Sequence, residues 1–270
     1  MTDILVHPST AKQRYDADGV VQVKGLLSPD EVAHIRDVFT AKVESDVAFG
    51  WDDNLPEDDI LARYPRFVHP HRHPDVEAGR LAQQYMFDPR IFTVVEDLIG
   101  PAWGAQSMFY FKPPTARGQA LHQDNAFLRA DPETCLAAWI AIDDCDGENG
   151  GLMVVPGSHR VQILCLEPAD QDESFSTAQV PVPEGVEIHQ TEMKAGDVLF
   201  FHGSMVHGSK ANTSTDRFRR SLIFHYVPQA SEEIALFYDP LIAPNGDEVH
   251  IKDSGDGGPC GEGWGPAGPH

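Results

Sequence analysis

The stretch GDVLFFHGSMVHGSKANTSTDRFRRSLIFHY, residues 196–226, holds two runs typical of β-strands on either side of a polar connection. The runs, at residues 197–203 and 219–228, are rich in Leu, Ile, Val, Phe and Tyr, which favour a pleated and half-buried backbone. Gly, Ser, Asn, Thr and Asp fill most of the residues between them and indicate a turn. We therefore expect two short strands here, joined by a loop.

Three earlier runs have the same composition, and turn residues separate them. They are SMFYFKPP (107–114), LAAWIAIDD (136–144) and GLMVVPGSH (151–159). Several short strands at close spacing are typical of a β-sandwich or barrel. The sequence therefore predicts a mainly β fold.

Two helices are expected before these strands. Residues 28–43 open with a capping box, Ser28 and Glu31, and their apolar residues fall on one face of a helix. Residues 88–101 open with an Asp-Pro pair, which starts a helix, and end with a Gly-Pro pair, which stops one. The predicted fold class is thus mainly β with flanking α-helices.

The 270 residues show no repeat of fixed period, so we expect one domain over 1–270. It would have a helical N-terminal part at about 1–105, a β core at about 106–230 and a Gly/Pro-rich tail at about 253–270. Residues 165–191, rich in acids and proline, are expected to be a long insertion that acts as a lid or binding loop.

Charge and cysteine content narrow the function classes. Lys and Arg number 20 against 42 Asp and Glu, a net charge of −22, which disfavours nucleic acid and anionic membranes as partners. The N-terminus lacks a basic segment followed by an apolar run, and no 18-residue apolar stretch occurs. The cysteines form no C-x-x-C pair, so we expect reduced thiols and a cytoplasmic location; they are Cys135, Cys145, Cys165 and Cys260.

The segment ALHQDNAF contains an H-x-D pair, His122 and Asp124. Residues i and i+2 of an extended strand point to the same face, so this pair would aim an imidazole and a carboxylate at one point. A later histidine, either His202 or His207, would complete a set of two histidines and one carboxylate. Such a facial triad leaves coordination positions open and suits a non-haem Fe(II) that activates dioxygen.

An R-x-S pair follows the later histidines on the run RFRRSLIFHY. Arg219 and Ser221 alternate to one face of the expected strand, where a guanidinium and a hydroxyl could hold a carboxylate. An iron site and a carboxylate clamp together indicate a 2-oxo acid as cosubstrate.

At this point the sequence resembles a known family, the phytanoyl-CoA dioxygenase family of Fe(II)- and 2-oxoglutarate-dependent oxygenases. The resemblance rests on four segments in order: FYFKPP (109–114), LHQDNAF (121–127), AAWIAIDDCDGENGGLMVVPGSHR (137–160) and AGDVLFFHGSMVHGSKANTSTDRFRRSLIFHY (195–226). It implies a double-stranded β-helix, or jelly-roll, as the core. It also implies Fe(II), 2-oxoglutarate and O2 as cofactor and cosubstrates.

The resemblance further implies roles for single residues. It makes His122, Asp124 and His207 the iron ligands, since the family pattern H-G-S with an Asn five residues later fits His207 better than His202. The "F-R-x-S" register assigns the distal carboxylate of 2-oxoglutarate to Arg219 rather than to its neighbours Arg217 and Arg220. Ser209 and Trp139 would lie near the cosubstrate.

Other residues are pocket candidates. We expect Ser221 and Gln106 beside the cosubstrate, and Phe127, Lys112 and Arg160 in contact with the substrate. The three alternating histidines of PRFVHPHRHPD (65–75) lack cysteines and a second cluster, so a surface or lid loop is expected rather than a zinc site.

The expected reaction is hydroxylation, or a related oxidation, of a C–H bond, with release of succinate and CO2. The carboxylate of Asp124 favours this outcome, because related halogenases have a small residue in its place. The net charge favours a small metabolite or natural-product intermediate over an acyl-CoA, whose phosphates require Lys and Arg clusters. The alternatives are a cupin-type metal-dependent isomerase or hydrolase and a metal-free jelly-roll that binds a ligand without catalysis.

Overall fold

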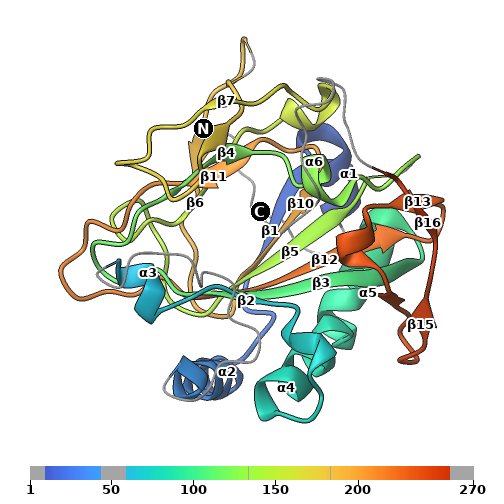
Figure 1. The fold of residues 1–270 in the computed structure, drawn as a ribbon, viewed down its shortest axis with the longest axis horizontal. Coiled ribbons are helices and arrows are strands. Elements are labelled where there is room, and N and C mark those ends of the chain that lie inside the picture. Colours follow the sequence, from blue (N-terminus) through green and yellow to red (C-terminus); the bar gives the residue numbers. More distant parts are fainter. Residues whose placement is uncertain (1–9, 44–58, 133, 183, 256–270) are drawn as a thin grey trace.

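Two antiparallel sheets face each other in the computed structural model, as a jelly-roll requires (Figure 1). The structure describes residues 10–43, 59–132, 134–182 and 184–255. Most of the Gly/Pro-rich tail and Cys260 lie outside the described residues. The predicted fold class, mainly β with flanking helices and a jelly-roll core, is confirmed.

The larger sheet forms the lower wall of the jelly-roll in Figure 1. All its strand pairs are antiparallel. The short strand β2 (Phe67–Val68) pairs with β3 and lies outside the main strand order. The order is β1 (Val20–Val23), β10 (Val198–His202), β5 (Leu136–Ala141), β12 (Ser221–Pro228), β3 (Ala102–Tyr110), β14 (Leu241–Ile242) and β15 (Glu248–Val249).

The smaller sheet faces it from above in the same view. Its order is β4 (Gln119–His122), β11 (His207–Ser209), β6 (Leu152–Val154) and β9 (His189–Gln190). The pairing of β4 with β11 sets His122 directly opposite His207. Two residues 85 positions apart in the chain, 207 − 122, therefore become neighbours.

Two short strand pairs complete the β structure. They are β7 (Glu167–Pro168) with β8 (Ala178–Gln179), and β13 (Glu233–Ile234) with β16 (Lys252–Asp253). The first pair lies inside the predicted insertion, residues 165–191. That insertion is bound to β4, because Gly118 accepts a bond from the Phe175 N–H and Leu121 accepts one from Val180.

Helices cover the outer face of the larger sheet, with α2, α4 and α5 beneath it in Figure 1. The helices are α1 (Ala11–Asp18), α2 (Pro29–Val43), α3 (Ile60–Arg63), α4 (Glu77–Met86), α5 (Pro89–Ile99) and α6 (Asn125–Leu128), with 3-10 turns at Pro70–Arg72, Ser158–Arg160 and Leu236–Tyr238. None of the helices in the described part of the chain has the length and apolar run needed to span a membrane.

The two predicted helices form with the predicted caps. The backbone N–H of Ser28 donates to the Glu31 carboxylate (2.8 Å), and the N–H of Glu31 donates to the Ser28 hydroxyl (3.3 Å). Arg90 joins this cap to the start of α5 by donating to both Glu31 and Asp88. This bonding lowers the pKa of Glu31 to about 2. The caps therefore also tie α2 to α5.

Alternation along β12 divides the core into two layers. Leu222, Phe224 and Tyr226 pack outward against the helices, whereas Ile223 belongs to the cluster between the sheets. On the outer side, Phe39 of α2 stacks on Phe109 of β3 with ring centroids 4.2 Å apart. The outer layer fixes the larger sheet, so that its inner face can present polar side chains in fixed positions.

Three expectations are corrected. The N-terminal part is not only helical, because β1 from this region pairs with β10 at the edge of the larger sheet. Cys165 is disulfide-bonded, so the expectation of reduced thiols is wrong for it, while Cys135 and Cys145 are free. The PRFVHPHRHPD segment is not a surface loop at its centre, since His69 and His71 are buried.

We expect Phe39→Ala to destabilise the protein by about 3–5 kcal/mol, because it removes a fully buried ring from the layer between α2 and β3. Urea unfolding followed by circular dichroism measures this loss. Asp37→Ala, on the exposed side of the same helix, should change stability by no more than ~0.5 kcal/mol. A loss below about 1 kcal/mol in Phe39→Ala would contradict this packing.

Candidate metal and cosubstrate site

Three side chains converge between the sheets at the paired ends of β4 and β11. Ligand atoms of His122, Asp124 and His207 lie within 4.8 Å of one another, and all three residues are buried. The Asp124 Oδ1 atom is 3.3 Å from His207 Nε2 and 3.6 Å from His122 Nε2. Metal–ligand bonds of about 2.1 Å at right angles place neighbouring donor atoms roughly 3 Å apart, so the three atoms can share one ion.

Backbone carbonyls fix the orientation of both imidazoles. His122 Nδ1 lies 2.8 Å from the Ala120 oxygen, and His207 Nδ1 lies 3.0 Å from the Met205 oxygen. A carbonyl oxygen only accepts, so each Nδ1 carries the proton and each Nε2 presents its lone pair to the site. This arrangement is the one that a histidine needs to bind a metal ion through Nε2.

Burial and neighbouring charges set the protonation of the two histidines. Burial, helped by the nearby His207, lowers the pKa of His122 to about 3, so this imidazole is neutral at pH 7. Burial is the largest single effect on His207 and opposes its charge, but the charge of Asp124, the hydrogen bond to it and the bond to the Met205 carbonyl together raise the pKa of that ring. The fully buried Asp124 carboxylate thus stabilises a positive charge beside it, and a bound metal ion would supply that charge.

The triad lines a narrow inner cavity of about 20 Å³ whose other wall is the larger sheet. Trp139, Ser209 and Arg219 line this cavity together with the triad, as do Tyr110, Gln119 and His225. The guanidinium of Arg219 lies 5.6 Å from the Trp139 ring centroid, and its Nη1 donates to the Ser221 hydroxyl (3.1 Å). The R-x-S pair therefore forms a continuous polar wall beside the metal ligands.

Two buried basic side chains stand at this wall, and neutral carbonyl and hydroxyl oxygens accept their hydrogen bonds. Arg219 Nε donates to the Gly150 carbonyl (3.2 Å), and Lys112 Nζ donates to the same carbonyl (3.3 Å) and to Ser209 Oγ (2.7 Å). Burial lowers the pKa of both groups, and the charge of Arg219 lowers the pKa of Lys112 further. Because buried charges require compensation, this end of the cavity favours a carboxylate.

Gly150 makes this wall possible. Its φ of 71° lies in the left-handed region, which glycine adopts without strain. A Cβ atom here would be 2.6 Å from the Lys210 carbonyl oxygen and 2.8 Å from Lys112 Cδ. The glycine pair of ENGGLMVV thus shapes the binding wall, in addition to the hairpin role that its sequence suggests.

The structure separates the three neighbouring arginines. Arg219 reaches the cavity, whereas Arg220 pairs with Asp143 (2.8 Å) and Arg217 pairs with Asp146 (2.8 Å). The register shift of β12 against β3 occurs beyond His225, so it leaves the alternation of Arg219 and Ser221 intact.

An outer cavity of about 340 Å³ adjoins the inner one and shares Gln119 and His122 with it. Phe127 lies in its wall, 6.2 Å from the His122 ring centroid. Its remaining lining residues are Arg66, Leu166, Phe175, Ser176, Thr177 and Ala178. Most of these come from the 165–191 insertion, which therefore covers the approach to the metal site.

Three of the predicted pocket residues lie elsewhere. Lys112 sits behind Ser209 and lines neither cavity, so the structure does not bring it to the substrate side. Arg160 is exposed and donates to the Ala17 carbonyl, away from both cavities. Gln106 is fully buried, faces His225 across β3 and β12, and also lines neither cavity.

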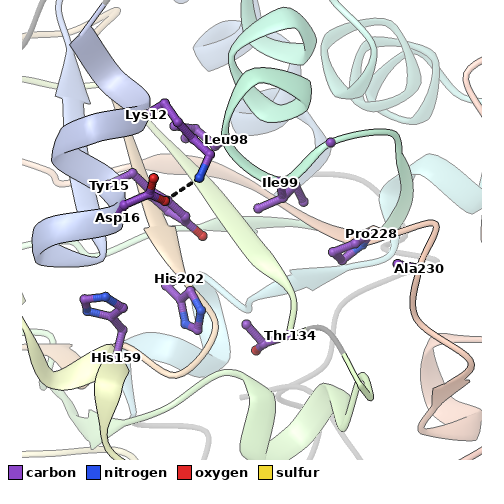
Figure 2. A pocket seen from close by; sticks show the side chains of 11 residues that line it. Lys12, Tyr15, Asp16, Leu98, Ile99, Thr134, His159, His202, Pro228 and Ala230 are labelled. Carbon is purple, nitrogen blue, oxygen red and sulfur yellow. Dashed lines mark hydrogen bonds and ion pairs between the residues drawn. The ribbon is translucent and has the colours of Figure 1, made fainter.

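A separate and larger cavity of about 490 Å³ lies between α1, the end of α5 and the end of β10 (Figure 2). His202 lines it, facing His159 with ring centroids 5.3 Å apart and Tyr15 at 6.0 Å. Burial, together with His159, lowers the pKa of His202 to about 4. None of the triad residues lines this cavity, so His202 is excluded from the metal site by position.

Sequence reasoning missed three polar lining residues, Tyr110, Gln119 and His225. His225 continues the alternation of Ser221 and Ile223 along β12, so extending the R-x-S pattern by two steps would have found it. Gln119 comes three residues before His122, and its Nε2 lies 3.3 Å from His122 Nε2. No sequence signal marks Gln119, because its position depends on the irregular pairing of β4 with β11, where Gln119 lies opposite Ser209.

Comparison with known proteins agrees with this geometry. The phytanoyl-CoA dioxygenase (PhyH) family matches residues 15–221. The chain is 34% identical to phytanoyl-CoA dioxygenase 1 of Oryza sativa subsp. japonica over 215 residues, which cover 78% of this chain and 76% of that protein. It is 29% identical to the peroxisomal phytanoyl-CoA dioxygenase of Mus musculus, covering 80% and 68% of the two chains.

Solved structures share the fold. The non-haem α-ketoglutarate-dependent epimerase SnoN from nogalamycin biosynthesis superposes with a TM-score of 0.67 at 22% identity, covering 93% of this chain and 95% of that one. The carbocyclase SnoK from the same biosynthesis gives 0.64 at 24% identity, covering 82% and 84%. SnoN has also been crystallised with Fe3+, α-ketoglutarate and nogalamycin RO.

A jelly-roll that carries a His-Asp-His triad beside a buried arginine defines the class of iron- and 2-oxoglutarate-dependent oxygenases. Within that class, the chain belongs to the phytanoyl-CoA dioxygenase family. The expected cofactor and cosubstrates, iron, 2-oxoglutarate and O2, are those of this class, and the donor set of the triad suits the iron.

We expect His122→Ala and Asp124→Ala each to weaken Fe(II) binding by about 100-fold or more, since each removes a ligand whose surroundings are built for the ion. Anaerobic calorimetric titration of the metal-free protein measures the affinity. His202→Ala is the matched control, because it removes a histidine from the same segment as His207 and outside the triad. Wild-type affinity in either ligand variant would refute the assignment.

Proposed function

We propose that this protein oxidises a C–H bond of a small-molecule metabolite or natural-product intermediate, chiefly by hydroxylation, and converts 2-oxoglutarate to succinate and CO2. The observation that carries the proposal is the position of the triad and Arg219 around one inner cavity, which shares His122 and Gln119 with a second cavity. Cosubstrate and substrate would thus meet at the metal from different sides.

In this proposal some residues of the inner cavity hold the iron and others hold 2-oxoglutarate. His122, Asp124 and His207 hold the iron by one atom each, which leaves three positions of an octahedral ion open. Arg219 holds the distal carboxylate of 2-oxoglutarate, with Ser221 orienting its guanidinium. The bound iron with 2-oxoglutarate and O2 supplies the oxidising chemistry, while the protein provides geometry and excludes water.

Ser209, Trp139 and Lys112 would support the cosubstrate from the side. Ser209 Oγ accepts from Lys112 Nζ, so its own hydroxyl proton is available to a carboxylate. Trp139 packs beside Arg219 and limits where that side chain can move. We therefore retain Ser209 and Trp139 as cosubstrate residues, and assign Lys112 to the same wall rather than to the substrate.

The outer cavity supports the proposed substrate class. Phe127, Leu166 and Phe175 offer apolar and aromatic surface, and Ser176 and Thr177 add hydroxyls. This lining suits a ring system or carbon chain with a few polar groups. The net charge of −22 disfavours a phosphate-rich CoA ester. SnoN and SnoK, which share the fold, come from the biosynthesis of a natural product.

The outcome of the reaction is proposed as hydroxylation because Asp124 fills the carboxylate position of the triad. Desaturation and ring formation are the related outcomes. A cytoplasmic location stays a prediction.

The activity test is a panel of candidate small molecules scored for succinate release that depends on Fe(II), O2 and 2-oxoglutarate. We expect some members to raise succinate formation above the rate without substrate. A cupin-type isomerase or hydrolase would turn over without consuming 2-oxoglutarate. A metal-free binding module would show neither turnover nor an absorption band on anaerobic addition of Fe(II) and 2-oxoglutarate. Either result would refute the proposal.

We expect Arg219→Ala to raise the KM for 2-oxoglutarate about 10- to 100-fold, the cost of losing a hydrogen-bonded charge, with a smaller effect on kcat. Steady-state succinate assays over a range of 2-oxoglutarate concentrations separate the two constants. Arg220→Ala is the control of equal charge, because Arg220 pairs with Asp143 and lies outside the cavity. An unchanged KM in Arg219→Ala would contradict the clamp.

A further inference from the structure

We infer that His225 is a positioning residue that holds Asp124 in one-atom coordination of the metal ion. The inference rests on the iron site of the proposed function and extends it to a residue outside the ligand set. His225 Nε2 lies 3.1 Å from Asp124 Oδ2, while the other oxygen, Oδ1, faces the two ligand imidazoles. The two oxygens of one carboxylate therefore have different partners.

The hydrogen bond has a defined direction and is shielded from water. An ionised carboxylate only accepts, so Nε2 of His225 is the donor. His225 is 1% exposed and Asp124 is 0% exposed, which strengthens the bond relative to one at the surface. His225 is held in turn by strand pairing, with Gln106 of β3 on one side and Ala137 of β5 on the other.

Its position links the two sheets. His122 and His207 come from the smaller sheet, whereas His225 comes from β12, in the middle of the larger one. The same strand begins at Ser221, which orients Arg219. One strand thus places the group that anchors the cosubstrate and the group that fixes the metal-binding carboxylate.

The consequence concerns the open coordination positions. A carboxylate that bound through both oxygens would occupy two of the six positions of an octahedral ion, and only two would remain. 2-Oxoglutarate needs two by itself, so none would be left for O2. By holding Oδ2 away from the ion, His225 keeps the third position open. Asp124 also enters the site already oriented, which favours metal affinity.

A matched pair of substitutions tests this role in the full-length protein. Gln and Met have similar length and flexibility, but only Gln carries an N–H donor. We expect His225→Met to weaken Co(II) binding to the metal-free protein about 10- to 100-fold and to alter the visible spectrum of bound Co(II), which reports coordination number. His225→Gln should stay within about threefold of wild type, a change of under 1 kcal/mol.

Control variants distinguish a general effect on packing from a specific effect on metal binding. His71→Gln, at an equally buried histidine bonded to Ser107, should leave the Co(II) affinity and spectrum unchanged. Equal Co(II) affinities and spectra in His225→Met and His225→Gln would overturn the inference. If His225→Met does not fold, a loss of about tenfold or more in a folded His225→Gln would also overturn it. Failure of the wild type to bind Co(II) would instead refute the iron site itself.

Discussion

The buried carboxylate of Asp124 is the constraint on which the rest of the site depends. It is fully buried and lies within 3.6 Å of three imidazoles, those of His122, His207 and His225. A buried charge is tolerated only where partners compensate it. Those partners come from β4, β11 and β12, so this one group requires both sheets of the jelly-roll to be in place at their present separation.

The charge distribution of the site follows from the same requirement. One end of the inner cavity has a buried anion, Asp124. The other end has a buried basic group, Arg219, with Lys112 behind Ser209, and the hydrogen bonds of both basic groups go to neutral oxygens. A cation at the first end and a dicarboxylate stretching to the second would compensate both. The unliganded site thus lowers the stability of the protein until the cation and the dicarboxylate bind. The apolar layer between the larger sheet and the helices keeps the fold intact.

Local sequence signals predicted much of the structure. The capping box at Ser28 and the Asp-Pro start at Asp88 gave both helices, because a cap depends on residues three or fewer positions apart. Alternation predicted that Arg219 and Ser221 share a face, and they do. Local signals failed where distant segments decide burial. The histidines at 69 and 71 look like a polar loop, yet they are buried, with His71 bonded to Ser107 of β3.

The sequence by itself determined the residue types of the chemistry: an H-x-D pair, a later histidine and an R-x-S pair. The two pairs can be recognised over three residues, because every second side chain of a strand points to the same face. The residue pattern alone left His202 and His207 open, and the family resemblance favoured His207. The tertiary structure decided between them, because the register of β11 against β4 sets His207 opposite His122 while His202 faces another cavity. It also decided that Lys112 stands behind Ser209 and that His225 supports Asp124. These two contacts join residues 97 and 101 positions apart in the chain, so packing between the sheets rather than local spacing brings them together.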